Sequence, residues 1–143
     1  MSRKAVEASF AAAIGPYSHA VWSGKRLYLS GQTPLDPATG QLAEGDIGAQ
    51  TEQCFKNLFS VLAAVGLGPK NVIKANVYMT NLADFAAMNA VYETMFEKPY
   101  PARTTIGVAD LPRGAQIEIE LVAYGKSKRR KPEKSEKSEA AGE

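Results

Sequence analysis

The stretch PARTTIGVADLPRGAQIEIELVAYG, residues 101–125, contains two predicted strands and decides the fold. Residues 102–109 and 115–124 are rich in strand-forming side chains, and the intervening DLPRG is typical of a turn. The first strand nevertheless begins with a charged residue, Arg103. A lone charge in a buried strand costs several kcal/mol unless other groups pair with it. The partner of Arg103 is therefore either another residue of the chain or a ligand.

The second strand alternates between apolar and polar side chains. One face carries Ile117, Ile119 and Leu121, and the other carries Gln116, Glu118 and Glu120. If residues 102–124 form a hairpin, its register decides whether Arg103 lies on the isoleucine face or on the glutamate face. The cost of placing an arginine among isoleucines favours the glutamate face, beside Glu118. For Glu120 a solvated outer position is sufficient.

The segments before residue 101 alternate between strands and helices. Residues 25–33 and 71–80 read as strands, and turn-forming residues dominate positions 34–42. Apolar residues at three- and four-residue steps predict a helix from Asp46 to about Gly66 and another over residues 82–96. This order predicts an α+β fold in which two helices cover one face of a mixed sheet. The other face then needs a cover, because it would leave a wide apolar area in water, and an oligomer would supply one.

The composition indicates an ordinary soluble globular protein. A chain of 143 residues suggests one domain, and 45% hydrophobic and 22% charged residues fit this class. Cys54 is the single cysteine, so an intramolecular disulfide is excluded and a reducing compartment is favoured. The first ten residues lack the apolar run of a signal peptide, and no stretch is apolar enough to span a bilayer. We therefore expect a cytoplasmic protein without a membrane partner.

The last eighteen residues differ in composition from the rest. Residues 126–143, KSKRRKPEKSEKSEAAGE, carry seven Lys or Arg and four Glu, a net charge of +3. Subtraction from the totals of 17 and 15 leaves ten and eleven, a net charge of −1, for residues 1–125. This pattern predicts a single domain over 1–125 and a disordered charged tail over 126–143. The run KSKRRK could contact RNA or an acidic surface, although a solvated run of charges is the more common case.

Familiar catalytic and metal-binding motifs are missing from the sequence. The lone His19 and Cys54 cannot make a zinc site, and the chain has neither a phosphate-binding glycine loop nor a nucleophile elbow. We therefore expect no metal and no cofactor. Asn89 lies on the apolar stripe of the second helix, where a buried amide needs partners, and a bond to a nearby loop is the simplest expectation.

Five segments together resemble the RidA/YjgF (reactive intermediate deaminase) family. They are AIGPYSHAV (13–21), LYLSGQTPLDPATG (27–40), NVIKANVYMTNLADFAAMNAVYETMF (71–96), PARTTIGVADLP (101–112) and IEIELVAYG (117–125). The resemblance extends over about residues 5–125. It implies a chorismate-mutase-like α+β fold and a homotrimer, with the sheets around a central β-barrel and the clefts between subunits.

The resemblance also implies an activity and its residues. The family hydrolyses 2-imino acids, such as 2-iminobutanoate and 2-iminopropanoate, to 2-oxo acids and ammonia without a cofactor. Arg103 matches the family's carboxylate-binding arginine, Glu118 matches the acidic residue that positions water, and Tyr17 is placed with them as catalytic. The matching substrate-binding positions are Ser30, Gly31, Asn89 and Thr105, and Thr105 stands where the best-characterised imine deaminases have cysteine.

The chemistry is compatible with these residue types. A guanidinium forms two parallel hydrogen bonds with a carboxylate, which a lysine cannot do. Bound in this way, an imine carbon is held for attack by a water that Glu118 orients. Two alternatives remain open, a ribonuclease that inhibits translation and a module that binds a small carboxylic acid without turnover. The net charge of −1 over residues 1–125 argues against the ribonuclease.

Overall fold

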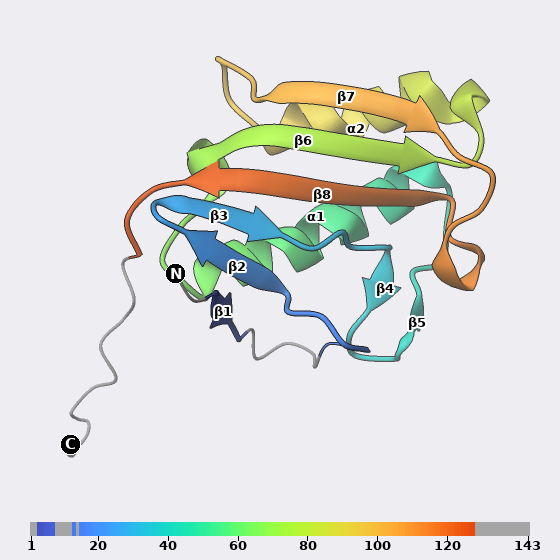
Figure 1. Cartoon of the computed structure of the whole chain (residues 1–143). Helices are drawn as coiled ribbons and strands as arrows, with labels where there is room; N and C mark the ends of the chain where they lie inside the picture. The colour runs from blue at the N-terminus through green and yellow to red at the C-terminus, as the bar shows by residue number, and fades with distance from the viewer. Residues whose placement is uncertain (1–2, 8–12, 14, 128–143) are drawn as a thin grey trace.

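The computed structural model describes residues 3–7, 13 and 15–127 (Figure 1). The predicted disorder of the tail from residue 128 onward lies outside the described residues. Six strands form one mixed sheet in the order β1-β2-β3-β8-β6-β7, and two short strands form a separate arm. The sheet strands are β1 Lys4–Val6, β2 Ala20–Ser23, β3 Arg26–Leu29, β6 Val72–Met79, β7 Ala102–Gly107 and β8 Ile117–Tyr124. The arm consists of β4 Leu35–Asp36 and β5 Gln41–Leu42, inside the region predicted as turns.

The last two strands do not form the predicted hairpin. β7 pairs in parallel with β6, whereas β8 pairs antiparallel with both β3 and β6 and therefore lies between them. The connection through helix α2 returns the chain parallel to β6, as parallel strands require a crossover. The segment DLPRG must then pass the end of β6 to reach β8. It does so with a 3₁₀ turn at Pro112–Gly114, in which Arg113 has a positive φ of 61°.

Both helices cover the same face of the sheet, as predicted (Figure 1). Helix α1 (Ile47–Ala63) begins at Asp46, whose carboxylate accepts a hydrogen bond of 3.0 Å from the backbone N–H of Ala49. Helix α2 (Phe85–Met95) begins three residues later than the periodicity indicates, because Leu82–Asp84 form a separate 3₁₀ turn. The Asn81 side chain caps that turn by accepting from the N–H of Ala83.

The hydrophobic core lies between the helices and the sheet. Alternate residues of β6 and β8 point toward the helices and are buried, while Phe55 and Leu58 of α1 fill the space above them. Fully buried members include Leu27, Val61, Leu62, Val77, Met79, Met88, Ile117 and Ile119. Burying side chains of this size contributes about 1.5–3 kcal/mol each relative to exposure. The sequence pattern that placed the isoleucines of β8 in the core is therefore confirmed.

The opposite face of the sheet, which we call the open face, carries polar and aromatic side chains together. The register places on it Tyr28, Lys74, Asn76, Tyr78, Glu118, Glu120, Val122 and Tyr124. Tyr28 and Tyr124 are about half exposed, and the guanidinium of Arg26 lies 5.9 Å from the Tyr124 ring centre. The prediction that this face is a wide apolar area is therefore wrong, since carboxylates and an ammonium group lie between the aromatic rings. Within the described residues, no helix is long and apolar enough to cross a membrane.

Candidate functional site

Arg103 lies on the side of the sheet that the helices cover. In the parallel pairing it stands opposite Ala75 of β6, which is fully buried beneath the helices. Its Nη1 donates a hydrogen bond of 2.8 Å to Oδ1 of Asn89 in α2. The guanidinium carbon lies 4.5 Å from the ring centre of Tyr92 and 5.6 Å from that of Phe85. Helix α2 therefore holds the guanidinium by one amide and two aromatic rings.

The prediction that Arg103 shares a face with Glu118 is wrong. Glu118 stands opposite Tyr78 on the open face, and β6 separates its strand from that of Arg103. The prediction assumed that the apolar face offers an arginine nothing but aliphatic side chains. In the structure α2 supplies a carbonyl acceptor and the faces of two rings, which attract a cation without a carboxylate. Arg103 also keeps part of its surface exposed.

Among the described residues Asn89 bonds to Arg103 and not to a loop, contrary to the simplest expectation for it. Its carbonyl oxygen accepts the hydrogen bond from Arg103. Phe85, Asn89 and Tyr92 are spaced at i, i+4 and i+7, which places all three on one face of α2. The sequence assigned the two rings only to the core. The spacing of Phe85 and Tyr92 around Asn89 was the signal that could have identified the residues that contact the arginine.

The groove between α2 and β7 retains unused polar groups. A guanidinium has five N–H donors, and among the described residues Arg103 uses Nη1 alone in a hydrogen bond. Thr105, two residues along β7, also points toward the helices, since it stands opposite the buried Val77. Its Oγ1 is buried and has no hydrogen-bond partner among the described residues. The groove thus offers a planar fork and a hydroxyl to a ligand.

Glu118 lies in a different environment on the open face. Partial burial raises the pKa of its carboxyl group, and the nearby charge of Glu120 raises that pKa further. Glu120 itself accepts hydrogen bonds from the hydroxyl of Tyr78 (3.0 Å) and from Nδ2 of Asn76 (3.3 Å). Glu118 consequently keeps its proton to a higher pH than an ordinary glutamate.

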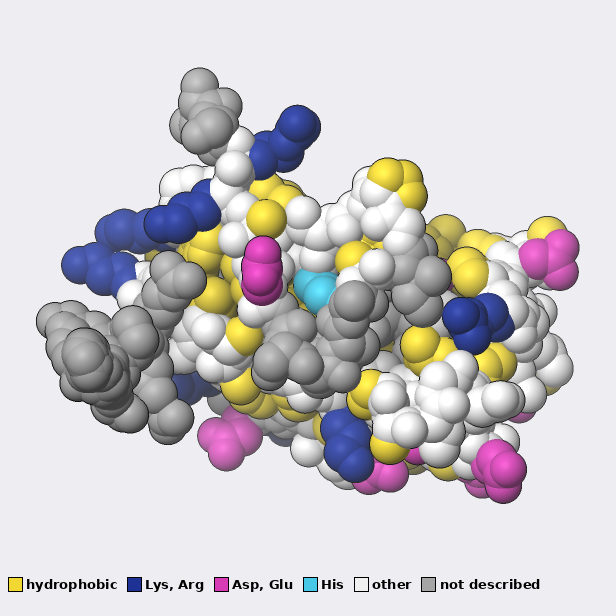
Figure 2. Space-filling view, turned by 90° about the horizontal axis from the view of Figure 1, so that it is seen from below, with side chains coloured by type: hydrophobic (Ala, Val, Ile, Leu, Met, Phe, Trp, Pro, Cys, Tyr) yellow, Lys and Arg dark blue, Asp and Glu magenta, His cyan; other side chains and the backbone are white. Residues whose placement is uncertain are grey.

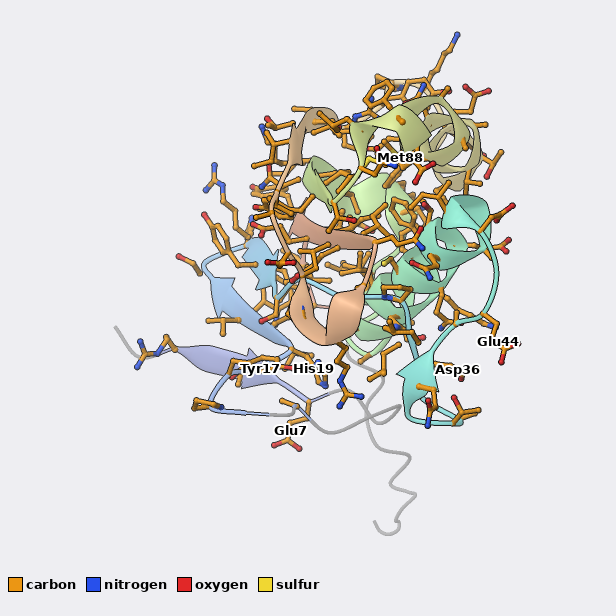
Figure 3. All side chains as sticks on the ribbon, turned by 90° about the vertical axis from the view of Figure 1, so that its right-hand side faces the viewer. Glu7, Tyr17, His19, Asp36, Glu44 and Met88 are labelled. Carbon is orange, nitrogen blue, oxygen red and sulfur yellow. The ribbon has the colours of Figure 1, made fainter. Side chains whose placement is uncertain are left out.

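Three other predicted site residues lie toward the Glu118 side of the molecule. A Cβ atom at Gly31 would overlap Oε2 of Glu118, so only glycine lets that carboxylate approach the backbone. The hydroxyl of Ser30 donates to the carbonyl of Ser18 (2.6 Å), which ties this strand end to the loop before β2. In that loop Tyr17 packs edge-on against His19, with ring centres 6.4 Å apart (Figure 3). Tyr17 is half exposed.

The predicted residues therefore form two groups. Asn89, Arg103 and Thr105 line what we call the Arg103 groove, and Glu118 with Gly31 forms the Glu118 site, which Ser30 and Tyr17 adjoin through the loop before β2. The sheet separates the two, so one subunit does not bring them into a common cleft. No group of three or more potential metal ligands exists among the described residues. Cys54 is buried, and burial raises the pKa of its thiol well above the usual value, which makes it a poor nucleophile.

Comparison with known proteins identifies relatives over most of the chain. The family model described as Endoribonuclease L-PSP matches residues 7–125. The chain is 48% identical to Protein DfrA of Myxococcus xanthus (86% of this chain, 96% of that protein). It is 45% identical to the mouse 2-iminobutanoate/2-iminopropanoate deaminase over 112 residues, or 78% of this chain and 83% of the mouse protein.

Solved structures show the same fold. RidA from an Antarctic Psychrobacter species is 43% identical and superimposes with a TM-score of 0.81 over 86% of this chain and all of that one. Escherichia coli TdcF, crystallised with bound serine, is 36% identical and has a TM-score of 0.80, with 85% of this chain and 98% of that one covered.

Proposed function

Because the chain belongs to the RidA/YjgF/L-PSP (Rid) family, we propose that it hydrolyses 2-imino acids, such as 2-iminobutanoate and 2-iminopropanoate, to 2-oxo acids and ammonia. The observation that carries this proposal is the partly exposed guanidinium of Arg103, held by neutral groups of α2. An arginine with a carboxylate partner in its own chain would have little left to bind a substrate. In this structure the charge of Arg103 and most of its N–H donors remain available to bind a substrate.

The reaction follows from the two groups of residues. Arg103 binds the substrate carboxylate through two parallel hydrogen bonds and so fixes the position of the adjacent C=N carbon. A water adds to that carbon, and its oxygen becomes the carbonyl oxygen of the 2-oxo acid when the C–N bond breaks and ammonia leaves. Glu118 accepts a proton from the water and returns one to the nitrogen. Partial burial and the charge of Glu120 raise the pKa of Glu118, which makes its carboxylate a stronger proton acceptor than an ordinary glutamate.

The site requires a second copy of the chain, because Arg103 and Glu118 lie on opposite sides of one sheet. We assign it to the interface of a homotrimer, where the Arg103 groove of one subunit meets the Glu118 site of the next, with the open faces of the sheets around a central barrel. Two features support this assembly. The open face carries half-exposed aromatic side chains, and each half-site lacks the group that the other supplies.

An ammonia-release assay tests the activity. The imine is generated in the cuvette by an amino-acid oxidase acting on L-2-aminobutyrate, and ammonia is measured above the spontaneous hydrolysis. We expect the full chain to accelerate release and Arg103→Ala to remove most of the acceleration. A protein that binds 2-oxobutanoate by calorimetry but does not accelerate release would instead be a carboxylate-binding module, and the enzymatic proposal would be wrong.

Ribonuclease activity is a second candidate, because the matching family model carries that name. The chain has a single histidine, so neither the Arg103 groove nor the Glu118 site can offer a histidine pair as acid and base. Incubation with a labelled RNA separates the candidates. Cleavage that persists after deletion of the tail but disappears in Arg103→Ala would favour the ribonuclease.

A further inference from the structure

A cavity of about 600 Å³ lies away from both half-sites, at the end of the molecule where β8 ends. Its walls come from strands β1 and β2, from the turn after β2, from the residues that follow α1 and from the residues that follow β8. We call it the Trp22 cavity. It is lined by Lys4, Ala5, Val6, Glu7, Trp22, Gly24, Lys25, Ala64, Val65, Gly125, Lys126 and Ser127. Its volume falls in the range of small-molecule sites.

Trp22 supplies an aromatic surface to this cavity. The indole is partly buried and packs against the core, so its position is fixed. In the antiparallel pairing Trp22 stands directly opposite Lys4, which places both side chains on the same face of the sheet. An ammonium group beside a fixed ring is the arrangement that binds a flat base next to its phosphate.

The cavity is positively charged although residues 1–125 carry a net charge of −1. Its lining contains three lysines and one glutamate, a net charge of +2. None of the three lysines forms an ion pair or a side-chain hydrogen bond with the residues that the structure describes. The carbonyl end of α1 nearby offsets only about half a charge. Figure 2 shows Lys and Arg side chains gathered at this end of the molecule beside hydrophobic ones.

The cations of the cavity are contributed by separate parts of the chain. Lys126 and Ser127 belong to the lining. The three lysines of the lining come from three segments: Lys4 from β1, Lys25 from the turn after β2 and Lys126 from the residues that follow β8. Repeated cations next to an aromatic platform suit a ligand with repeated negative charges and flat rings.

We propose that the Trp22 cavity binds single-stranded nucleic acid, with one base stacked on Trp22 and the neighbouring phosphates on Lys4, Lys25 and Lys126. A free phosphate would not use the ring, and an acidic peptide would not stack on it. The site binds without cutting, because Glu7 is the single carboxylate of the lining and no histidine belongs to it. It shares no residue with the Arg103 groove or the Glu118 site, so it does not depend on the imine activity.

Trp22 is the only tryptophan of the chain, so its fluorescence reports on this site directly. The probe is a labelled oligouridylate of about 12 nucleotides, within the usual span of such sites. We expect the full chain to bind it and its own fluorescence to be quenched. Trp22→Leu should weaken binding roughly tenfold to a hundredfold, with a smaller loss in Trp22→Phe, which keeps a ring for stacking. Binding without quenching in the unmodified chain would overturn the proposal even if Trp22→Leu fails to fold.

The lysines are tested against a variant of equal charge. Replacing Lys4, Lys25 and Lys126 by glutamine should weaken binding at least tenfold and reduce the slope of log K against log salt by about 2, since each phosphate contact on a single strand contributes about 0.7. The matched control replaces Lys56, Lys70 and Lys98, which lie outside the cavity. Equal losses in both triple variants would refute the site. Polyglutamate that quenches Trp22 and competes as well as the oligouridylate would refute nucleic acid as its ligand.

Discussion

The Arg103 groove and the Glu118 site lie on opposite sides of one sheet, and their surroundings have opposite effects on the charged group. Around Arg103, an amide oxygen and two ring faces favour the cation without neutralising it. Around Glu118, burial and the charge of Glu120 disfavour the anion. Neither group completes the other within a chain. This separation is what the proposed site between two subunits requires.

The largest effect is expected at Arg103. Arg103→Ala and Arg103→Lys should each lower the rate of imine hydrolysis about thirtyfold to several thousandfold, which corresponds to roughly 2–5 kcal/mol of activation free energy. Alanine removes the guanidinium, and lysine lacks its planar fork. The melting temperature should change little, since no carboxylate among the residues that the structure describes pairs with Arg103. Arg113→Lys, in an exposed loop, is the control. If Arg103→Ala unfolds the protein and Glu118→Gln rescues it, the two residues form a structural ion pair, and the interpretation of Arg103 as a substrate-binding residue is wrong.

A second test mixes two inactive proteins. Subunits carrying Arg103→Ala keep Glu118, and subunits carrying Glu118→Gln keep Arg103. If each site takes one residue from each of two subunits, coexpression gives trimers that contain both variants, and each of these has one complete interface out of three. Such mixed trimers should show about a third of the wild-type activity.

Activity of the mixed protein is measured after tandem affinity purification through a different tag on each variant. A mixture of separately assembled oligomers that do not exchange subunits is the control. Coassembled protein that stays inactive would show that both residues act within one chain, or that the assembly is different.

A smaller effect is expected in the same groove from the loss of the hydrogen bond that Asn89 accepts from Arg103. Asn89→Leu keeps the approximate size but removes the acceptor, so Arg103 would lose its fixed orientation over Tyr92. We expect a loss of about tenfold to a hundredfold in kcat/KM, in line with hydrogen bonds to charged groups. Glu93→Gln changes an exposed residue of the same helix and should leave kcat/KM unchanged. Equal activity in Asn89→Leu and wild type would mean that the rings alone orient the guanidinium.

The smallest effect concerns the pH dependence at Glu118. Its pKa in the folded chain is raised above the value of 4.5 that the group has in the unfolded chain, so the folded state binds more protons between pH 4.5 and the raised pKa. The contribution of this group to stability is therefore complete at low pH and falls as the pH rises through the raised pKa. Glu118→Gln should flatten that fall and raise the melting temperature at pH 8 by on the order of one or two degrees. Thermal melts from pH 4 to 8 measure it, and a lower melting temperature in the variant at pH 8 would contradict the raised pKa.

Periodicity in the sequence was sufficient for the helices and the core. It placed α1, α2 and the isoleucine face of β8 correctly, because apolar spacing reflects burial directly. It missed β1 and β2, whose few residues show no alternation long enough to detect. It also paired β7 with β8, since a strand order in which β6 intervenes depends on contacts far apart in the sequence.

The candidate site shows the same limit. Arg103 was identified as a charge at the start of an apolar strand, and Gly31 through the family resemblance, and the structure gives each a physical reason. The prediction of the side of the sheet on which Arg103 lies was wrong, because it assumed that β7 pairs with β8. Single residues are readable where their chemistry is unusual. Their mutual position is decided by topology, which local patterns do not contain.

The central place of β8 also has a consequence for folding. The last strand of the chain inserts between β3 and β6, so the contacts that close the sheet join residues 26–28 and 72–79 to residues 117–124. A nascent chain that has reached only residue 110 can form α1, β6, α2 and β7, but it leaves unpaired backbone on both sides of the gap. Such edges are prone to pair with other chains. We infer a slow, late closure step, as high contact order implies, and a need for protection during synthesis until residues 117–124 leave the ribosome.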